Sequence, residues 1–163
     1  MVSGENFPDA LSIASYAASQ QIPILLTSKN TLPSGVKDYL DKNGVKTVYT
    51  IGGTGVIADA TTSQLPGVER IYGNDRYETN FEVWAKFQFD TSRVYYANGE
   101  LFPDALSGSA LAGLGQHPVI LMSNQANQSF IDDLRYNKDL VKNKYILGGT
   151  GVMPMSLLDK IFK

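Results

Sequence analysis

The sequence contains no cysteine and only one histidine, His117. The absence of cysteine excludes disulfides, thiolate metal sites and thiol nucleophiles. Nothing in the sequence around His117 offers it a metal-binding or catalytic partner, so we interpret it as a structural or surface residue. The motifs GxxxxGKS/T, GxGxxG, HExxH and DxD are also missing. The sequence therefore predicts no cofactor, no metal and no catalytic residue of these familiar kinds.

The charge balance argues against a nucleic-acid partner, and the hydropathy argues against a membrane-spanning helix. The 14 basic and 16 acidic side chains give a net charge of -2, which lacks the positive field on which nucleic-acid binding relies. No apolar run approaches the roughly 20 residues that a membrane-spanning helix needs. Hydrophobic residues make up 43% of the chain and charged residues 18%, as in ordinary folded proteins. We expect a folded protein with no nucleic-acid partner and no membrane span.

An internal repeat dominates the sequence. Residues 3–26 read SGENFPDALSIASYAASQQIPILL, and residues 98–121 read NGELFPDALSGSALAGLGQHPVIL, at a constant offset of 95. A second pair of matching segments, IGGTGV at 51–56 and LGGTGV at 147–152, has an offset of 96. Two ordered matches at nearly the same spacing indicate one structural unit used twice.

Short apolar runs alternate with segments of helical periodicity in both copies. The runs are too short and continuous for helices and indicate buried strands at 24–26, 48–51, 68–72, 94–97, 119–122 and 145–147. Apolar residues at helical spacing predict helices over 8–19, 33–42, 75–87 and 155–162. Strands alternating with helices predict an α/β fold, in which each copy is a mostly parallel sheet with helices on both faces.

The segment 68–89, which contains RIYGNDRYETN, occurs only once, between the two copies. If a repeat begins with this segment, the chain divides into residues 1–67, which lack their opening helix, and 68–163, a second repeat. If a repeat begins instead with the strand that ends at Ser3, the division falls at 90/91. Either division predicts a truncated array, which is part of a longer series of repeats.

These motifs carry a resemblance to a known family. GENFPDALS with PILL, then IGGTGVI, then RIYGNDRYETN resemble the type 2 cell-wall-binding repeat of Gram-positive surface and S-layer-associated proteins, and the match covers nearly the whole chain. The resemblance implies tandem Toprim-like or Rossmann-like units that pack against one another. It also implies a secreted, non-enzymatic module at the cell wall or cell surface, anchored noncovalently to an anionic cell-wall polysaccharide.

Carried over to this sequence, the family's characteristic segment between the copies falls on Arg70, Asp75, Arg76 and Thr79. Guanidinium groups and free backbone N–H groups form directional, charge-assisted hydrogen bonds to sugar or phosphate oxyanions. Arg70 and Arg76 are therefore the leading cationic candidates for polymer binding. The alternative role of Arg76 is a structural ion pair with Glu78 or a neighbouring carboxylate.

The repeated motifs supply further candidates. Asp9 and Asp104 lie in the first turn of a predicted helix, where a carboxylate interacts favourably with the helix dipole, so we favour capping over ligand contact. Thr54 and Thr150, in the two GGTG turns, can donate hydrogen bonds to an anion or simply form the turn. The PILL-type segments are interpreted as structural strands; they comprise Pro23, Ile24, Leu25 and Leu26 in the first copy and Pro118, Val119, Ile120 and Leu121 in the second.

Two other functions stay open at this point. Parallel α/β folds host many enzymes, although the motifs named above are absent. Alternatively, the copies form a self-association repeat of a surface layer without a ligand. An incomplete repeat leaves a sheet edge or helix face uncovered, so we also expect packing against other repeats of the same protein or a homo-oligomer.

Overall fold

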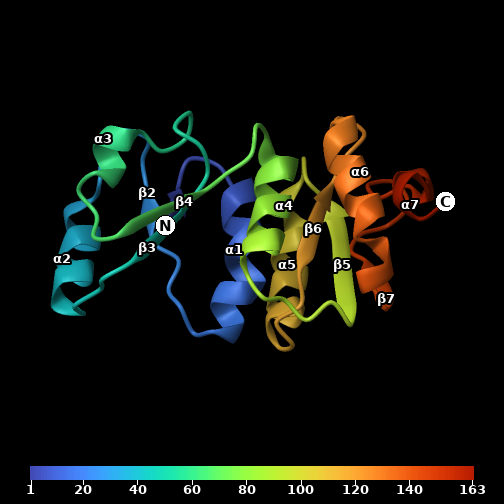
Figure 1. The fold of residues 1–163 in the computed structure, drawn as a ribbon, viewed down its shortest axis with the longest axis horizontal. Helices are drawn as coiled ribbons and strands as arrows, with labels where there is room; N and C mark the ends of the chain where they lie inside the picture. The colour runs from blue at the N-terminus through green and yellow to red at the C-terminus, as the bar shows by residue number, and fades with distance from the viewer.

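The computed structural model describes residues 1–163 and contains two parallel α/β units joined by one helix (Figure 1). In the first unit β1 pairs with β2 and β3 pairs with β4, all in parallel. Ile51 N donates to Met1 O at 2.9 Å, which places β3 beside β1. The elements of this unit are β1 (Val2–Ser3), α1 (Pro8–Ser19), β2 (Leu26–Thr27), α2 (Ser34–Lys42), β3 (Val48–Ile51), α3 (Asp59–Thr62) and β4 (Val68–Ile71).

The second unit repeats this order of strands. Its sheet runs β6-β5-β7, again with all pairs parallel, so β5 occupies the central place that β1 has in the first unit. The joining helix is α4 (Arg76–Lys86). The elements that follow it are β5 (Arg93–Asn98), α5 (Phe102–Gly113), β6 (Val119–Met122), α6 (Gln128–Tyr136), the 3-10 turn η1 (Lys138–Leu140), β7 (Asn143–Ile146) and α7 (Met155–Phe162).

Matching segments of the two copies adopt the same conformation. Both α1 and α5 begin with a proline in the first turn, where its missing N–H leaves no hydrogen bond unmade. Both helices lead into a glutamine in the left-handed region, Gln21 at φ 55° and Gln116 at φ 56°. The residue that follows each glutamine donates its N–H to an alanine carbonyl at 2.9 Å. The copies are therefore one structural unit used twice.

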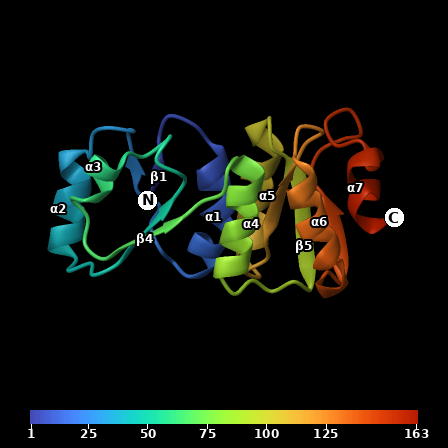
Figure 2. The same ribbon diagram turned by 45° about the horizontal axis from the view of Figure 1, so that its top comes forward.

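A layer formed by α1, α4 and α5 stands between the two sheets (Figures 1 and 2). Val83 of α4 packs in the core of the first sheet, whereas Leu11 of α1 and Tyr77 of α4 belong to the core of the second. On the outer faces, Leu40 of α2 covers the first sheet, and α6 and α7 cover the second. The predicted α/β fold, with parallel sheets and helices on both faces, is confirmed.

Segment 68–89 crosses from one unit to the other. Its strand β4 pairs with β3 of the first sheet, while Asn80 of α4 is hydrogen-bonded to edge strand β6 of the second. The Asn80 amide donates to Val119 O at 2.9 Å and accepts from Leu121 N at 2.9 Å. The predicted boundary at 67/68 separates strands β3 and β4, which pair, and stays a prediction about repeat units.

Three strand predictions were wrong in part. Residues 68–72 were expected to be a buried strand, but the strand is Val68–Ile71, of which only Ile71 is buried, and Tyr72 is 56% exposed. Residues 24–26 were expected to be a buried strand, but only Leu26–Thr27 is a strand, and Leu26 is 54% exposed. The reason is that β1, its partner, is only two residues long. Strand β7 was also expected to be buried, yet all four of its residues are exposed, because no strand covers it as β4 covers β3. None of the helices is long and apolar enough to span a membrane.

Candidate functional site

The carboxyl ends of β1, β3 and β4 open onto a polar cleft of about 410 Å³, at the edge where open parallel sheets bind ligands. The residues that line it come from three of the motifs singled out in the sequence: the start of FPDALS, the GGTG turn and the segment YGNDRYET. They are Asn6, Asp9, Gly52, Gly53, Thr54, Gly55, Val56, Tyr72, Gly73, Asn74, Asp75, Arg76 and Thr79. The fold therefore gathers separate sequence motifs into one site, which we call the polar cleft.

The FPDALS and GGTGV motifs meet at an aspartate and a glycine. Gly52 has a φ of 113°, and a Cβ placed on it would lie 2.5 Å from Oδ2 of Asp9. The second unit repeats this contact, with Gly148 at φ 101° and a Cβ that would lie 2.6 Å from Oδ2 of Asp104. Each contact needs a glycine, because a side chain is disfavoured at that φ and finds no space.

Asp9 is a buried carboxyl group at the floor of the polar cleft, only 6% exposed. Burial raises its pKa to about 6, and the nearby charge of Arg76 opposes part of that rise. Desolvation acts in this direction because it disfavours the charged form. Near neutral pH the cleft thus holds a carboxyl group that takes up a proton more readily than an exposed aspartate does.

The raised pKa of Asp9 predicts a pH dependence of stability. Between its ordinary value of 3.8 and its folded value of about 6, the folded state binds more protons than the unfolded state. Its stabilising contribution is therefore complete below about pH 4 and is lost as the pH rises through about 6. The Asp9→Asn variant has no carboxyl group at this position and does not lose this contribution. The unfolding free energy of the variant minus that of the native chain should therefore rise by about 3 kcal/mol from about pH 4 to pH 7.

Urea denaturation of both chains across this pH range measures the difference directly. A difference in unfolding free energy that is constant with pH would contradict the raised pKa of Asp9. The comparison is insensitive to any constant cost of the amide side chain, because only the slope against pH is used.

The GGTG turn presents backbone donors to the polar cleft. Gly53 O accepts hydrogen bonds from Val56 N at 3.0 Å and Ile57 N at 3.1 Å, which closes the turn. The N–H groups of Gly53, Thr54 and Gly55 have no acceptor within the protein. Consecutive free N–H groups in a turn form a concavity suited to an anion.

Arg76 reaches from the polar cleft to the second unit. Its Nη1 donates to Gly99 O at 2.9 Å and to Oε2 of Glu100 at 3.3 Å, and its guanidinium carbon lies 5.9 Å from the centre of the Phe7 ring. The side chain is 37% exposed. The structural ion pair that was the alternative role of Arg76 is thus formed, with the carboxylate of Glu100 and not with that of Glu78.

The amino end of α4 is held by its own side chains. Oδ1 of Asp75 accepts from Tyr77 N at 2.8 Å and Glu78 N at 2.9 Å, as an N-cap does. Thr79 is buried and accepts from Gly73 N at 3.0 Å. Asp75 and Thr79 thus shape the wall of the polar cleft by fixing this turn.

The other cationic candidate, Arg70, does not line the polar cleft. Its guanidinium donates to Gly52 O at 2.7 Å, to Oδ1 of Asp59 at 3.2 Å and to Oγ1 of Thr62 at 3.3 Å, and only 14% of its side chain is exposed. This set of bonds holds β4 to the GGTG turn and to α3. Arg70 thus supports the turn, and a contact between Arg70 and the polymer stays a prediction.

The remaining candidates lie elsewhere. Asp104 and Thr150 belong to the second unit and do not line the polar cleft. Val119 and its neighbours form the buried strand β6, whereas Pro23, Ile24 and Leu25 line a separate apolar pocket. No three histidine or acidic side chains are grouped closely enough to hold a metal ion.

Sequence reasoning missed several residues at the site. Asn127 caps α6 and donates from Nδ2 to Oε1 of Glu78 at 2.6 Å, which ties α6 to the start of α4. Glu100 also accepts a hydrogen bond from the Tyr77 hydroxyl. Glu100 was visible as the repeat partner of Glu5, but nothing local indicated that Arg76 would reach it.

Two solved structures share this fold. Cwp6 from Clostridium difficile matches 98% of the chain with a TM-score of 0.85 and 29% sequence identity. Cwp8 from Clostridium difficile matches 99% of the chain with a TM-score of 0.80 and 28% identity. The matched part is 27% of the first protein and 28% of the second.

Curated relatives come from Bacillus subtilis. The chain is 28% identical over 161 residues to N-acetylmuramoyl-L-alanine amidase LytC, and the match covers 99% of this chain and 32% of LytC. It is 32% identical over 129 residues to the amidase enhancer, and that match covers 77% of this chain and 17% of the enhancer. The chain therefore spans about a third or less of the length of these relatives.

A family profile described as Cell wall binding domain 2 (CWB2) matches residues 1–62 and 70–158. The two matched segments together include both copies of FPDALS and both copies of GGTGV. This agrees with the resemblance read from the motifs. The chain belongs to the Cell wall binding domain 2 family.

Proposed function

We propose that this chain is a non-catalytic module that holds a surface protein to an anionic polysaccharide of the cell wall through the polar cleft. The observation that carries the proposal is the convergence of three kinds of donor in one open site. These are the guanidinium of Arg76, the free N–H groups of residues 53–55 and the hydroxyl of Thr54.

The groups that line the polar cleft are better suited to binding an oxyanion than to catalysing a reaction. Arg76 uses Nη1 for its contacts within the protein, so its other nitrogen donors remain for a carboxylate or phosphate. Asp9 is the one strongly shifted acid at the floor, and with a pKa of about 6 a modest fall in pH makes it a hydrogen-bond donor as well. No nucleophile and base pair of the kind used in covalent catalysis lines the cleft.

The exposed aromatic ring of Tyr72 in the polar cleft favours a sugar as the ligand. Tyr72 lines the polar cleft with 56% of its surface exposed. Its ring borders Gly53, where an added Cβ would lie 3.4 Å from Cδ2 of the tyrosine. An exposed ring with a hydroxyl at its edge can pack against a sugar face while it donates to a sugar oxygen.

Replacement of Arg76 tests the proposal. Arg76→Ala should lower the affinity for purified wall polymer about tenfold or more, since a charge-assisted hydrogen bond contributes about 1.5 to 3 kcal/mol. Binding of the native module should also weaken with added salt. Isothermal titration with the polymer and sedimentation with cell walls measure both effects. Arg135→Ala is the matched control, because Arg135 lies on α6 and pairs with Asp132 at 3.2 Å, outside the cleft.

Arg76 also contacts Gly99 and Glu100, so circular dichroism must establish that the variant stays folded. Arg76→Lys keeps the charge but not the paired donors, and we expect it to bind with intermediate affinity. Walls stripped of their anionic polymer should no longer sediment the native module. Undiminished sedimentation with stripped walls would refute polymer recognition.

One observation favours self-association as a second candidate function. Leu11 of α1 is 3% exposed, whereas Leu106, its counterpart on α5, is 56% exposed. Phe102 and Leu111 are exposed on the same helix. Because α1 is covered by the second unit, the apolar face of α5 supports packing against a further repeat or another copy of the chain.

A further inference from the structure

The chain contains two asparagine–glycine pairs, Asn43–Gly44 and Asn98–Gly99. In such a pair the backbone nitrogen of the glycine can attack the side-chain carbonyl carbon of the asparagine and close a succinimide ring. Glycine favours the attack because it has no Cβ to hinder the close approach. Since the two pairs have the same local chemistry, a difference in their reactivity comes from the fold around them.

The first pair lies at the carboxyl end of α2, where both Asn43 and Gly44 are exposed. A Cβ placed on Gly44 would meet no atom within 4 Å. Gly44 N donates to Asp41 O at 3.1 Å, and Nδ2 of Asn43 donates to Tyr39 O at 2.8 Å. Both hydrogen bonds belong to the last turn of the helix and open easily, because helix ends fray.

The second pair is held closed by the second sheet. Oδ1 of Asn98 accepts a hydrogen bond from Glu100 N at 2.7 Å, and Nδ2 donates to Val152 O at 2.7 Å. The attacking atom, Gly99 N, donates to Met122 O at 2.9 Å, and Gly99 is buried. An attack at Asn98 would require these bonds to break inside a packed sheet, so the fold protects this pair.

The second unit also contains a counterpart of Asn43 that lacks the glycine. Asn137 ends α6 as Asn43 ends α2, and both have φ -95° and ψ 3°. Nδ2 of Asn137 donates to Asp133 O at 2.8 Å, which repeats the bond from Asn43 to Tyr39. The next residue is Lys138, whose side chain hinders attack by its backbone nitrogen. Asn137 therefore separates the effect of the helix end from the effect of the glycine.

We propose that Asn43 is a site of spontaneous modification, at which the side-chain amide is converted to a carboxylate through a succinimide. A bond forms between Gly44 N and Cγ of Asn43, and the bond from Cγ to Nδ2 breaks. The amide proton of Gly44 leaves with the side-chain nitrogen as ammonia. Water then opens the ring at one of its two carbonyl carbons. Opening at Cγ gives aspartate, and opening at the main-chain carbon gives isoaspartate, in which the backbone runs through the side chain.

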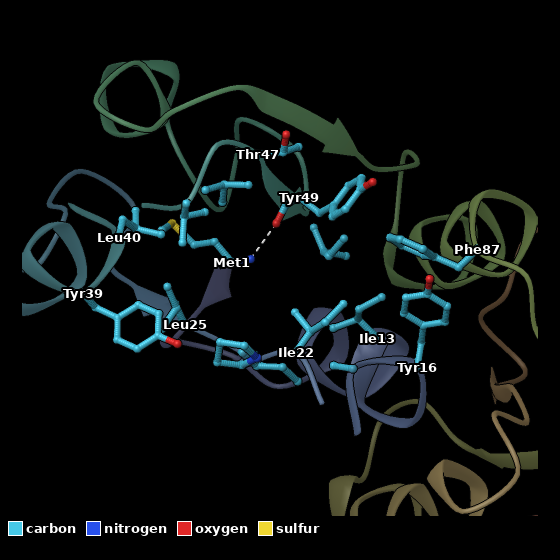
Figure 3. Close-up of a pocket in the computed structure, with 16 residues that line it drawn as sticks. Met1, Ile13, Tyr16, Ile22, Leu25, Tyr39, Leu40, Thr47, Tyr49 and Phe87 are labelled. Atoms are coloured by element: carbon cyan, nitrogen blue, oxygen red, sulfur yellow. Dashed lines mark hydrogen bonds between the residues drawn. The ribbon is translucent and has the colours of Figure 1, made fainter. Parts of the chain in front are cut away.

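Either product weakens the end of α2. The new carboxylate cannot donate to Tyr39 O, and its negative charge lies at the carboxyl end of a helix, where the helix dipole disfavours it. Figure 3 shows Tyr39 and Leu40, from this last turn, among the residues that line the apolar pocket. Leu40 is 4% exposed and belongs to the core of the first unit. Modification of Asn43 therefore loosens the cover that α2 gives to the first sheet.

The test incubates the full folded chain at mildly alkaline pH and follows each asparagine by peptide mapping with mass spectrometry. This detects the mass gained when an amide becomes an acid, and retention separates isoaspartate from aspartate. We expect Asn43 to react at least about tenfold faster than Asn98, because a packed site opens more rarely than a fraying helix end. Asn137 should also react more slowly than Asn43, because a lysine follows it.

Two controls isolate the contribution of the fold. Asn43→Gln keeps the amide but would need a larger ring, so this variant should gain no carboxylate at position 43. In guanidinium chloride the unfolded chain should modify Asn43 and Asn98 at similar rates. Equal rates at these two residues in the folded chain would overturn the proposal, and so would an Asn43 that reacts only after unfolding. Every readout is made without polymer, so either result leaves the proposed polymer binding untouched.

Discussion

Gly52→Ala should destabilise the fold by about 3 kcal/mol or more. The residue has a φ of 113°, and the new Cβ would lie 2.5 Å from Oδ2 of Asp9 and 2.7 Å from Cγ2 of Val56. Strain in that backbone region costs on the order of 1 to 3 kcal/mol by itself, and overpacking of a closed site adds a similar amount. Urea denaturation monitored by circular dichroism measures the loss.

Gly55→Ala is the matched control for this loss. It lies in the same turn, its φ is not in the left-handed region, and an added Cβ would meet nothing within 4 Å. We expect its stability to change by less than about 1 kcal/mol. Gly148→Ala, in the second copy, should repeat the large effect because its surroundings repeat those of Gly52. Equal stabilities of the Gly52 and Gly55 variants would contradict the packing described for the turn.

Asn80→Ala should cost about 3 kcal/mol. Its amide group donates to Val119 O and accepts from Leu121 N, both at 2.9 Å, and it donates to Oγ of Ser12 at 3.1 Å. The side chain is 2% exposed, so alanine leaves buried backbone groups of β6 unsatisfied, at roughly 1 to 3 kcal/mol for each. Asn80 thus pairs with an open sheet edge as a further strand would.

Asn80→Asp separates the hydrogen bonds from the packing, because aspartate keeps the shape and loses both N–H donors. We expect it to be at least as destabilising as alanine, since its carboxylate would face Val119 O. Asn43→Ala is the control, because Asn43 is exposed and its single side-chain bond is to Tyr39 O in α2, the helix whose end it caps. Stability of the Asn80 variants within about 0.5 kcal/mol of that control would refute the role of Asn80 at the sheet edge.

Much of the fold could be predicted from the sequence. The predicted helices at 8–19 and 155–162 have the observed bounds, because proline marks each start and apolar residues recur at helical spacing. The predicted strand at 48–51 also has its observed bounds. Helix α6 was not predicted, although Phe130, Ile131 and Leu134 are all buried at helical spacing. Its signal was present, and Asn127 marks its start as an N-cap.

The candidate site was predictable only in its parts. The repeat pointed to Asp9 and Thr54, and the segment between the copies pointed to Arg76. Local sequence could not distinguish Arg76 from Arg70, because both flank the same turn. The difference depends on long-range partners: Arg70 meets Gly52 O and Asp59, whereas Arg76 meets Gly99 O. Contacts between residues so far apart in the chain follow from the packing of the two sheets.

The helical layer between the sheets has a consequence for how the protein loses its structure. Leu11 lies on a helix of the first unit but packs in the hydrophobic core of the second, and α4 contributes to the cores of both. Neither unit can unfold without exposing part of the hydrophobic core of the other. Denaturation should therefore be one cooperative event, and a lesion at either end of the chain weakens the whole molecule.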